Sequence, residues 1–125
     1  MSSQSQLSPT SISVDLKKYR IRIFKNTIHL LGDPKHIQLL VSPSKMEVAI
    51  RAVESELPAA QTHKVNQHQM NSDNSFEIYS RTFVLKLCEV VGQLETTGTY
   101  RISGEVLPKQ KVAVYSLKTI KKVEI

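Results

Sequence analysis

The first clear hydrophobic pattern lies at residues 18–24, where apolar and polar side chains alternate. A period of two is typical of a strand with one buried face. The apolar positions are Tyr19, Ile21 and Ile23, and the polar positions are Lys18, Arg20 and Arg22. The pattern therefore predicts a half-buried strand whose outward side chains are all basic.

A short helix is predicted directly after this strand. Asn26 or Thr27 offers a side-chain N-cap, and Gly32 would be the C-terminal residue of the helix. Pro34 confirms the stop, because proline has no amide hydrogen with which to continue a helix. Residues 35–41 and 46–53 then read as two strands that form a hairpin around a turn rich in serine and proline.

A second segment repeats the order strand, helix, strand, strand. Its predicted elements are a strand from residue 76, a helix at 81–91 capped by Gly92, a strand at 99–103, a turn at 104–110 and a strand at 111–117. The basic residues 118–125 would be either a last strand or a tail. A unit this small cannot bury its own apolar faces, so two copies in one chain favour an internal pseudo-dimer.

The predicted fold class is therefore α+β, with two β-α-β-β units that form a small shared barrel or sheet. The alignment is tightest where residues 23–28 match residues 78–83 and where residues 48–50 match residues 112–114. The predicted organisation is a flexible leader at 1–13, a first unit at 14–53, a polar linker at 54–75 and a second unit at 76–125, all in one compact domain.

Composition narrows the class of protein. The 125 residues, 40% of them hydrophobic, suit a soluble globular domain with a core of Ile, Leu and Val. The single cysteine, Cys88, excludes an intrachain disulfide, and its apolar neighbours predict a buried structural thiol. No apolar run approaches the roughly 20 residues of a membrane span, and the N-terminus lacks the features of a signal peptide. A cytoplasmic location follows by elimination.

The formal charge of +6 favours an anionic partner such as nucleic acid. Basic residues cluster near the first predicted strand, with no acidic residue between Asp15 and Asp33. On a strand, Lys18, Arg20 and Arg22 would project from one face at intervals of about 7 Å, close to the phosphate spacing of a DNA strand. The alternative reading is a solvated face, or an edge strand whose charge prevents aggregation.

The second unit adds basic residues, but Glu77, Glu89 and Glu95 dilute its charge. Any DNA-binding face would therefore be asymmetric and led by the first unit. The nucleic-acid-binding candidates are Lys17, Lys18, Arg20, Arg22, Lys25, Arg81, Lys86 and Arg101.

Signatures of catalysis are lacking. The sequence has no glycine-rich phosphate loop, no Gly-x-Ser-x-Gly elbow and no His-Glu-x-x-His motif. His63 and His68 lie five residues apart without a cysteine partner, which is a poor ligand set for a metal. We therefore expect a non-enzymatic protein without a cofactor or a metal.

The first unit resembles the swapped-hairpin DNA-binding fold of the AbrB/MazE/SpoVT class. The resemblance rests on Arg22-Ile23-Phe24-Lys25, on the helix that ends at Leu31-Gly32, and on the two hairpin strands. Phe24 stands where that class usually has proline, and the second helix is longer than in the class. The resemblance implies a DNA-binding protein, such as a transcriptional regulator, whose chain supplies both units of one barrel and acts as a monomer or dimerises again.

A non-enzymatic protein-interaction or assembly module is the alternative function. DNA binding requires the basic residues of both units to lie on one continuous surface, whereas scattered positive charge favours the interaction module.

Overall fold

The computed structural model describes residues 8–54, 61–65 and 75–123, which form a mixed α+β protein dominated by antiparallel strands. The strands are β1 (Ser8–Asp15), β2 (Arg20–Phe24), β3 (His36–Ser42), β4 (Glu47–Val53), β5 (Gln61–Lys64), β6 (Ser75–Tyr79), β7 (Thr99–Leu107), β8 (Val112–Ser116) and β9 (Lys121–Lys122). The α-helices are α1 (Lys25–Leu30) and α3 (Arg81–Val91). Short 3₁₀ turns lie at Pro108–Gln110 and Leu117–Thr119.

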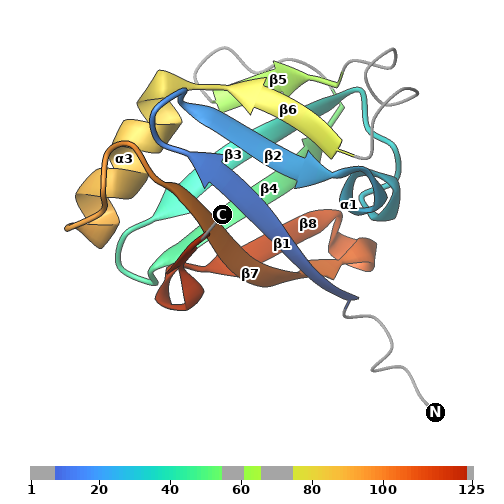
Figure 1. The fold of residues 1–125 in the computed structure, drawn as a ribbon. Helices are drawn as coiled ribbons and strands as arrows, with labels where there is room; N and C mark the ends of the chain where they lie inside the picture. Colours follow the sequence, from blue (N-terminus) through green and yellow to red (C-terminus); the bar gives the residue numbers. More distant parts are fainter. Residues whose placement is uncertain (1–7, 55–60, 66–74, 124–125) are drawn as a thin grey trace.

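These strands make one sheet that curls into a nearly closed barrel (Figure 1). The strand order is β5-β3-β4-β8-β7-β1-β2-β6, and β9 adds to β7. The order strand, helix, strand, strand occurs at β2-α1-β3-β4 and again at β6-α3-β7-β8. Strands from the two halves of the chain are interleaved, because β1 pairs with β7, β2 pairs with β6 and β4 pairs with β8. The predicted hairpin is confirmed as β3 and β4.

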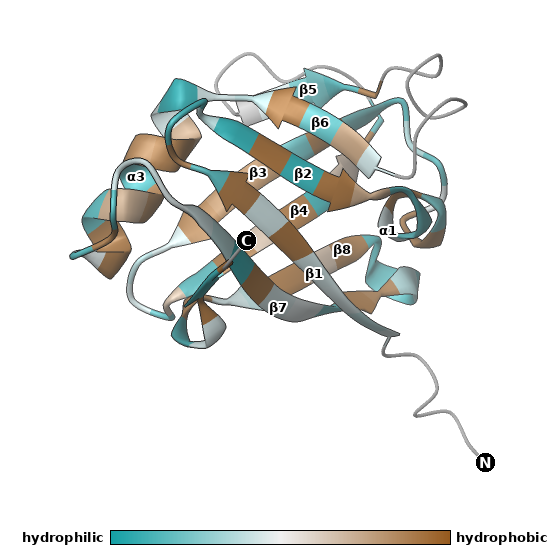
Figure 2. Ribbon diagram, in the orientation of Figure 1, coloured by the Kyte–Doolittle hydropathy of each residue, from teal (hydrophilic) through white to brown (hydrophobic). Residues whose placement is uncertain are grey.

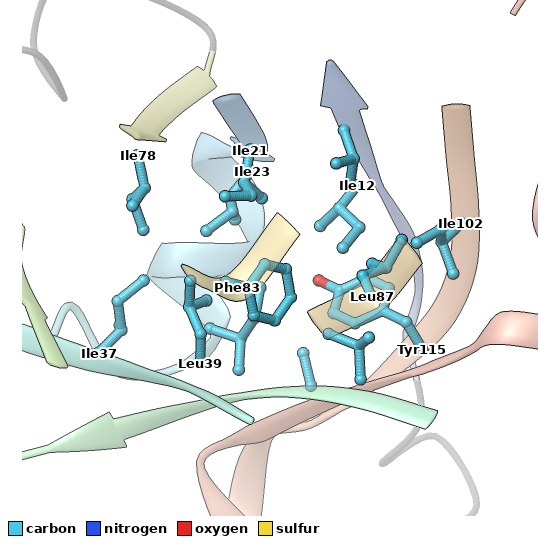
Figure 3. Packing of buried hydrophobic residues seen from close by; sticks show 14 of the residues in the cluster. Ile12, Ile21, Ile23, Ile37, Leu39, Ile78, Phe83, Leu87, Ile102 and Tyr115 are labelled. Atoms are coloured by element: carbon cyan, nitrogen blue, oxygen red, sulfur yellow. The ribbon is translucent and has the colours of Figure 1, made fainter. Parts of the chain in front are cut away.

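The core fills the interior of the barrel. Inward side chains of the strands meet Phe83 and Leu87, which α3 contributes from one end of the barrel (Figure 3). The alternation predicted for residues 18–24 is confirmed over β2, where Ile21 and Ile23 are buried while Arg22 is exposed. Lys18 and Tyr19, which were predicted to belong to this strand, lie in the turn before it. Figure 2 shows this alternation of apolar and polar positions along β2.

The two helices differ in how well local sequence predicted them. The predicted helix at residues 81–91 matches α3, whose first turn is capped where Ser80 Oγ accepts a hydrogen bond from the amide of Phe83 at 3.2 Å. The N-cap predicted for α1 was wrong, since α1 begins at Lys25 and Phe24 makes no side-chain cap. Thr27 is instead buried, and its hydroxyl is hydrogen-bonded to that of Thr10 on β1 at 2.7 Å.

Three strands were missed or shortened by the sequence analysis. Residues 8–13, predicted as leader, belong to β1, which lies between β2 and β7. β5 lies within the predicted linker, and β7 continues through Gly104 to Leu107 where a turn was predicted. Each of these segments pairs with strands that are distant in sequence. The rest of the predicted leader and linker, at residues 1–7, 55–60 and 66–74, lies outside the described residues.

Gly104 explains why β7 can continue across the barrel. A Cβ atom at this position would lie 2.1 Å from the carbonyl oxygen of Val114 and 2.7 Å from Cα of Tyr115, both on β8. Only glycine permits so close an approach of two backbones. The turn predicted at residues 104–110 was therefore wrong over residues 104–107, which continue β7, while residues 108–110 form a 3₁₀ turn.

Candidate nucleic-acid interface

The outward side chains of β6, β2, β1, β7 and β9 form one exposed surface, which we call the outer face. A single row of directly paired positions crosses all five strands. Along this row lie Glu77, Arg22, Ser13, Arg101 and Lys121, in the order β6, β2, β1, β7, β9. Neighbouring strands lie about 4.8 Å apart, so the Cα atoms of Arg22 and Arg101 are separated by about 10 Å. The tertiary structure thereby unites basic residues from both halves of the chain.

Two of the predicted basic residues are neutralised by acidic partners. Arg22 donates to Glu77 Oε2 from Nε at 3.0 Å and from Nη2 at 2.7 Å. Arg20 donates from Nη2 to Asp15 Oδ2 at 3.2 Å across the β1–β2 pair. The expectation that this basic stretch is uncompensated was therefore wrong. Asp15 folds back over the turn, and Glu77 arrives from a strand 55 residues away in sequence.

The turn between β1 and β2 holds the next candidates. Asp15 Oδ1 accepts hydrogen bonds from the backbone amides of Lys17 and Lys18 at 3.0 and 3.2 Å, which fixes the turn. Arg81, at the start of α3, lies over the ring of Tyr19 in this turn, with 5.7 Å from Cζ to the ring centroid. This cation–π contact joins one candidate of the second unit to the basic turn of the first.

The remaining candidates separate into two groups. Lys25 is the first residue of α1, beside the outer face, and Arg101 is exposed on β7 within it. Lys86 lies on α3, outside the outer face, and its Nζ donates to Glu89 Oε1 at 3.2 Å. The structure thus brings Arg20, Arg22 and Arg101 onto one sheet surface and leaves Lys86 apart.

Arg101 and Lys121 are the cations of the outer face for which the described residues provide no ion pair. They line a surface hollow of about 600 Å³ together with the hydroxyl-bearing Ser103 and Thr119. Lys122 also lines this hollow, but both oxygens of Glu95 accept hydrogen bonds from its Nζ at 2.9 Å. Arg101 and Lys121 therefore add positive charge on β7 and β9 to that of Lys17, Lys18 and Lys25, which border the outer face and likewise have no ion pair among the described residues.

A second hollow of about 440 Å³ adjoins the first and shares Arg101 and Ser103 with it. It lies between β1, β7 and the start of α1. Its lining combines apolar side chains, Phe24 among them, with the amide of Asn26. We call the two depressions the β9 hollow and the α1 hollow. Arg101 and Ser103 lie where the two hollows adjoin.

Two aromatic rings stand exposed on the outer face. Phe24 is 43% exposed at the end of β2, and Tyr79 is 62% exposed at the end of β6. Both directly follow a buried isoleucine in an alternating strand, which is the signal that would have placed them outward. The sequence analysis missed them as site residues, and it also left out Lys121 and Lys122, whose position depends on the pairing of β9 with β7.

The histidines and the cysteine do not form a cluster in the described part of the chain. His29 Nδ1 lies 2.5 Å from Asp33 Oδ1 at the end of α1. Burial lowers the pKa of His63 on β5 and raises the pKa of the half-buried Cys88 thiol. His68 lies outside the described residues. Within residues 8–54, 61–65 and 75–123, no three His, Cys, Asp or Glu side chains are grouped so that they could hold a metal ion.

Comparisons with known proteins do not place this chain in a family. No family model, no curated protein and no solved structure matches this chain. In the part of the chain that the structure describes, neither helix has the length and apolar character needed to cross a membrane.

Proposed function

We propose that this chain is a non-enzymatic DNA-binding protein and that the outer face is its binding surface. The observation that carries the proposal is the cross-strand row, which places Arg22, Arg101 and Lys121 on one exposed face. Basic side chains at such spacing attract phosphates, release counterions and give the salt-dependent affinity of nucleic-acid-binding proteins. Ser103 in the adjoining β9 hollow adds a hydroxyl group that can donate to a phosphate oxygen, whereas the hydroxyl of Thr119 already donates to the carbonyl oxygen of Ser116 at 2.7 Å.

Within this proposal, Arg101 and Lys121 supply most of the attraction. Arg20 and Arg22 already have carboxylate partners, so a phosphate must compete with Asp15 and Glu77 for them. Lys17, Lys18 and Lys25 border the outer face and would extend its positive field at low ionic strength.

We further propose that the two β-α-β-β units form an internal pseudo-dimer, as in the AbrB/MazE/SpoVT class that the first unit resembles. The pairing of β2 with β6 supports this proposal. Its register is centred on Arg22 and Glu77, which are equivalent positions when residues 23–28 are aligned with 78–83. Antiparallel pairing of equivalent strands about equivalent residues is the arrangement expected around a two-fold axis.

The pairing of β4 with β8 supports the same proposal. Ala49 lies opposite Val114, and Ile50 lies opposite Ala113. In the alignment of the two units Ala49 corresponds to Ala113 and Ile50 to Val114, so the two pairs are exchanged by the same two-fold relation. A role as a transcriptional regulator would follow from this relationship to the class.

Fluorescence anisotropy tests the proposed function. Labelled duplex and single-stranded DNA are titrated with the protein at low and near-physiological salt. We expect affinity that falls steeply with salt, and the double variant Arg101→Ala/Lys121→Ala should weaken binding at least tenfold and flatten the salt dependence. Lys45→Ala, in the β3–β4 turn and outside the outer face, is the control and should leave binding unchanged. No binding of either DNA at low salt would overturn the proposal.

The interaction module is a second candidate that one observation favours. Four of the 17 Lys and Arg residues are already paired with carboxylates of the described residues, namely Arg20, Arg22, Lys86 and Lys122, and the first two lie on the outer face. If no nucleic acid binds, the exposed Phe24 and Tyr79 would instead be expected to contact a protein partner.

A further inference from the structure

We infer that the ligand of the outer face is single-stranded DNA, held with a base against Phe24 in the α1 hollow and with phosphates at Arg101 and Lys121 in the β9 hollow. This inference rests on the proposed function and specifies the form of nucleic acid that the two hollows accept.

The two hollows match the two chemical parts of a nucleotide. Phe24 presents a 43% exposed aromatic ring on the apolar side of the α1 hollow, on which a base can stack. Asn26 lines the same hollow, and its side-chain amide can both donate to and accept from a base edge. Arg101 also lines the β9 hollow. There the phosphate of the same nucleotide would contact both Arg101 and Lys121.

The geometry of charge favours a single strand over a duplex. In the described outer face, Arg101 on β7 and Lys121 on β9 form a narrow band of cations without an ion pair, while carboxylates stand at Asp15 on β1, at Glu77 on β6 and at Glu105 farther along β7. A duplex that covered the whole face would bring phosphates close to these carboxylates. One strand can keep its phosphates on the band and turn its bases toward β2. In a duplex the bases are stacked on one another and cannot cover an exposed ring.

A second exposed aromatic ring lies on the outer face but away from the cations on β7 and β9. Tyr79 pairs with Arg20 in the register of β2 and β6, four residues along β2 from Phe24, so the Cα atoms of the two aromatic residues are about 14 Å apart. β6 is three strands from β7, and Glu77 lies on β6 beside Tyr79. A strand that holds its phosphates on β7 and β9 therefore stacks a base on Phe24 and does not reach Tyr79.

Deoxyribose fits the α1 hollow better than ribose. Pro9, Phe24 and Leu30 give the hollow an apolar wall. A 2′-methylene or a thymine methyl group can be buried against this wall without loss of hydrogen bonds, whereas a 2′-hydroxyl turned toward it, away from the polar side chains that line the rest of the hollow, would be desolvated. We therefore assign DNA as the ligand and use RNA of the same sequence as the competing ligand.

A tryptophan reporter provides the most direct test, because the chain contains no tryptophan. The variant Phe24→Trp places one at the proposed stacking position. Titration with an unlabelled 12-nucleotide single strand rich in thymine should quench its fluorescence at the concentrations that give binding by anisotropy. Tyr79→Trp, on β6 and three strands from β7, should not respond. Leu85→Trp, on the exposed side of α3, is the matched control and should not respond.

Affinity measurements complete the test. We expect the single strand to bind at least tenfold more tightly than its duplex or than the matching RNA, and Phe24→Ala to lose about tenfold, the order expected for one base–aromatic stack. Leu85→Ala should bind as wild type. Thermal melting by circular dichroism establishes that each variant is folded, and Phe24→Leu keeps an apolar side chain without an aromatic face if Phe24→Ala is unstable.

The outcomes separate the inference from the proposed function. Salt-dependent binding of duplex at equal or higher affinity, with no quenching of the tryptophan in the Phe24→Trp variant, overturns the single-strand inference and leaves DNA binding in place. Equal or tighter binding of RNA overturns the assignment to DNA. Absence of binding to all three ligands at low salt overturns the proposed function itself.

Discussion

Arg22 on β2 lies directly opposite Glu77 on β6, and both its Nε and its Nη2 donate to the same carboxylate oxygen. The pair links the first half of the chain to the second at the centre of one strand pairing. Its side chains are 43% and 27% exposed, so solvent screens the attraction. This contact therefore has two consequences: a modest contribution to stability, and the removal of one positive charge from the outer face.

The stability contribution of this pair can be measured by a double-mutant cycle. We expect a coupling free energy of about 0.2–1 kcal/mol between Arg22→Ala and Glu77→Ala, as for other exposed cross-strand ion pairs. The coupling should shrink in 1 M salt because ions screen exposed charges. Urea denaturation of the four proteins gives the value. A coupling well above about 2 kcal/mol would contradict this reading of the pair.

Removing the negative charge at Glu77 should strengthen DNA binding. Glu77→Gln releases Arg22 and deletes a carboxylate from the outer face, so we expect affinity for single-stranded DNA to rise threefold or more at low salt. Glu89→Gln makes the same change of charge on α3, away from this face. It should give a clearly smaller increase, and anisotropy titrations compare the two variants. Equal effects would mean that net charge alone determines affinity.

Gly104→Ala tests the close crossing of β7 and β8. The added Cβ would meet backbone atoms of Val114 and Tyr115, which cannot rotate away, so we expect a loss of about 3 kcal/mol. Gly92→Ala provides the comparison, because φ is 76° there but no atom lies within 4 Å of the added Cβ. Gly92 has ψ of 157°, a conformation found almost only in glycine, so backbone strain alone should cost about 1–3 kcal/mol there. Denaturant unfolding measures both variants, and a loss below about 1 kcal/mol at Gly104 would exclude the steric clash.

Ser80 caps α3, and its removal should weaken the helix that closes one end of the core. We expect Ser80→Ala to lower the free energy of unfolding by about 1 kcal/mol, because the amide of Phe83 loses its acceptor. Ser80→Gly should cost less, since glycine at an N-cap leaves the amide open to water. Thermal melting followed by circular dichroism compares the variants. An unchanged melting temperature for Ser80→Ala would show that the cap is dispensable.

Tyr115 should make stability fall at alkaline pH. Burial raises the pKa of its hydroxyl to about 12, and the nearby hydroxyls of Thr10 and Thr27 only partly offset the rise. Within the described residues the Tyr115 hydroxyl has no well-formed hydrogen bond. Above pH 10 the unfolded state releases this proton while the folded state keeps it, so stability declines as pH rises toward 12.

The matched variant isolates this effect. Between pH 8 and pH 11, wild type should lose about 1 kcal/mol more stability than Tyr115→Phe, which has no proton to release. Urea denaturation at each pH measures the difference. Parallel declines in the two proteins would place the titrating group elsewhere.

Local sequence was sufficient where one segment carries its own signals. The helix at residues 81–91 has an apolar stripe, a serine before it and a glycine after it, and α3 has these bounds. The β3–β4 hairpin likewise combines alternation with a turn. β1 was not predicted because the alternation of Ile12 and Val14 with serines is too short to indicate a strand. Its inward side chains are buried because β1 pairs with β2 on one side and with β7 on the other.

In the candidate site, too, local sequence predicted some features and strand pairing decided the others. The sequence by itself determined that Arg20 and Arg22 point outward on a half-buried strand, because alternation is a property of consecutive residues. Only the tertiary structure decided that Glu77 neutralises Arg22 and that Arg101 and Lys121 stand in the same row. Strand pairing sets which side chains become neighbours, and pairing between distant segments depends on how the whole barrel buries its apolar faces.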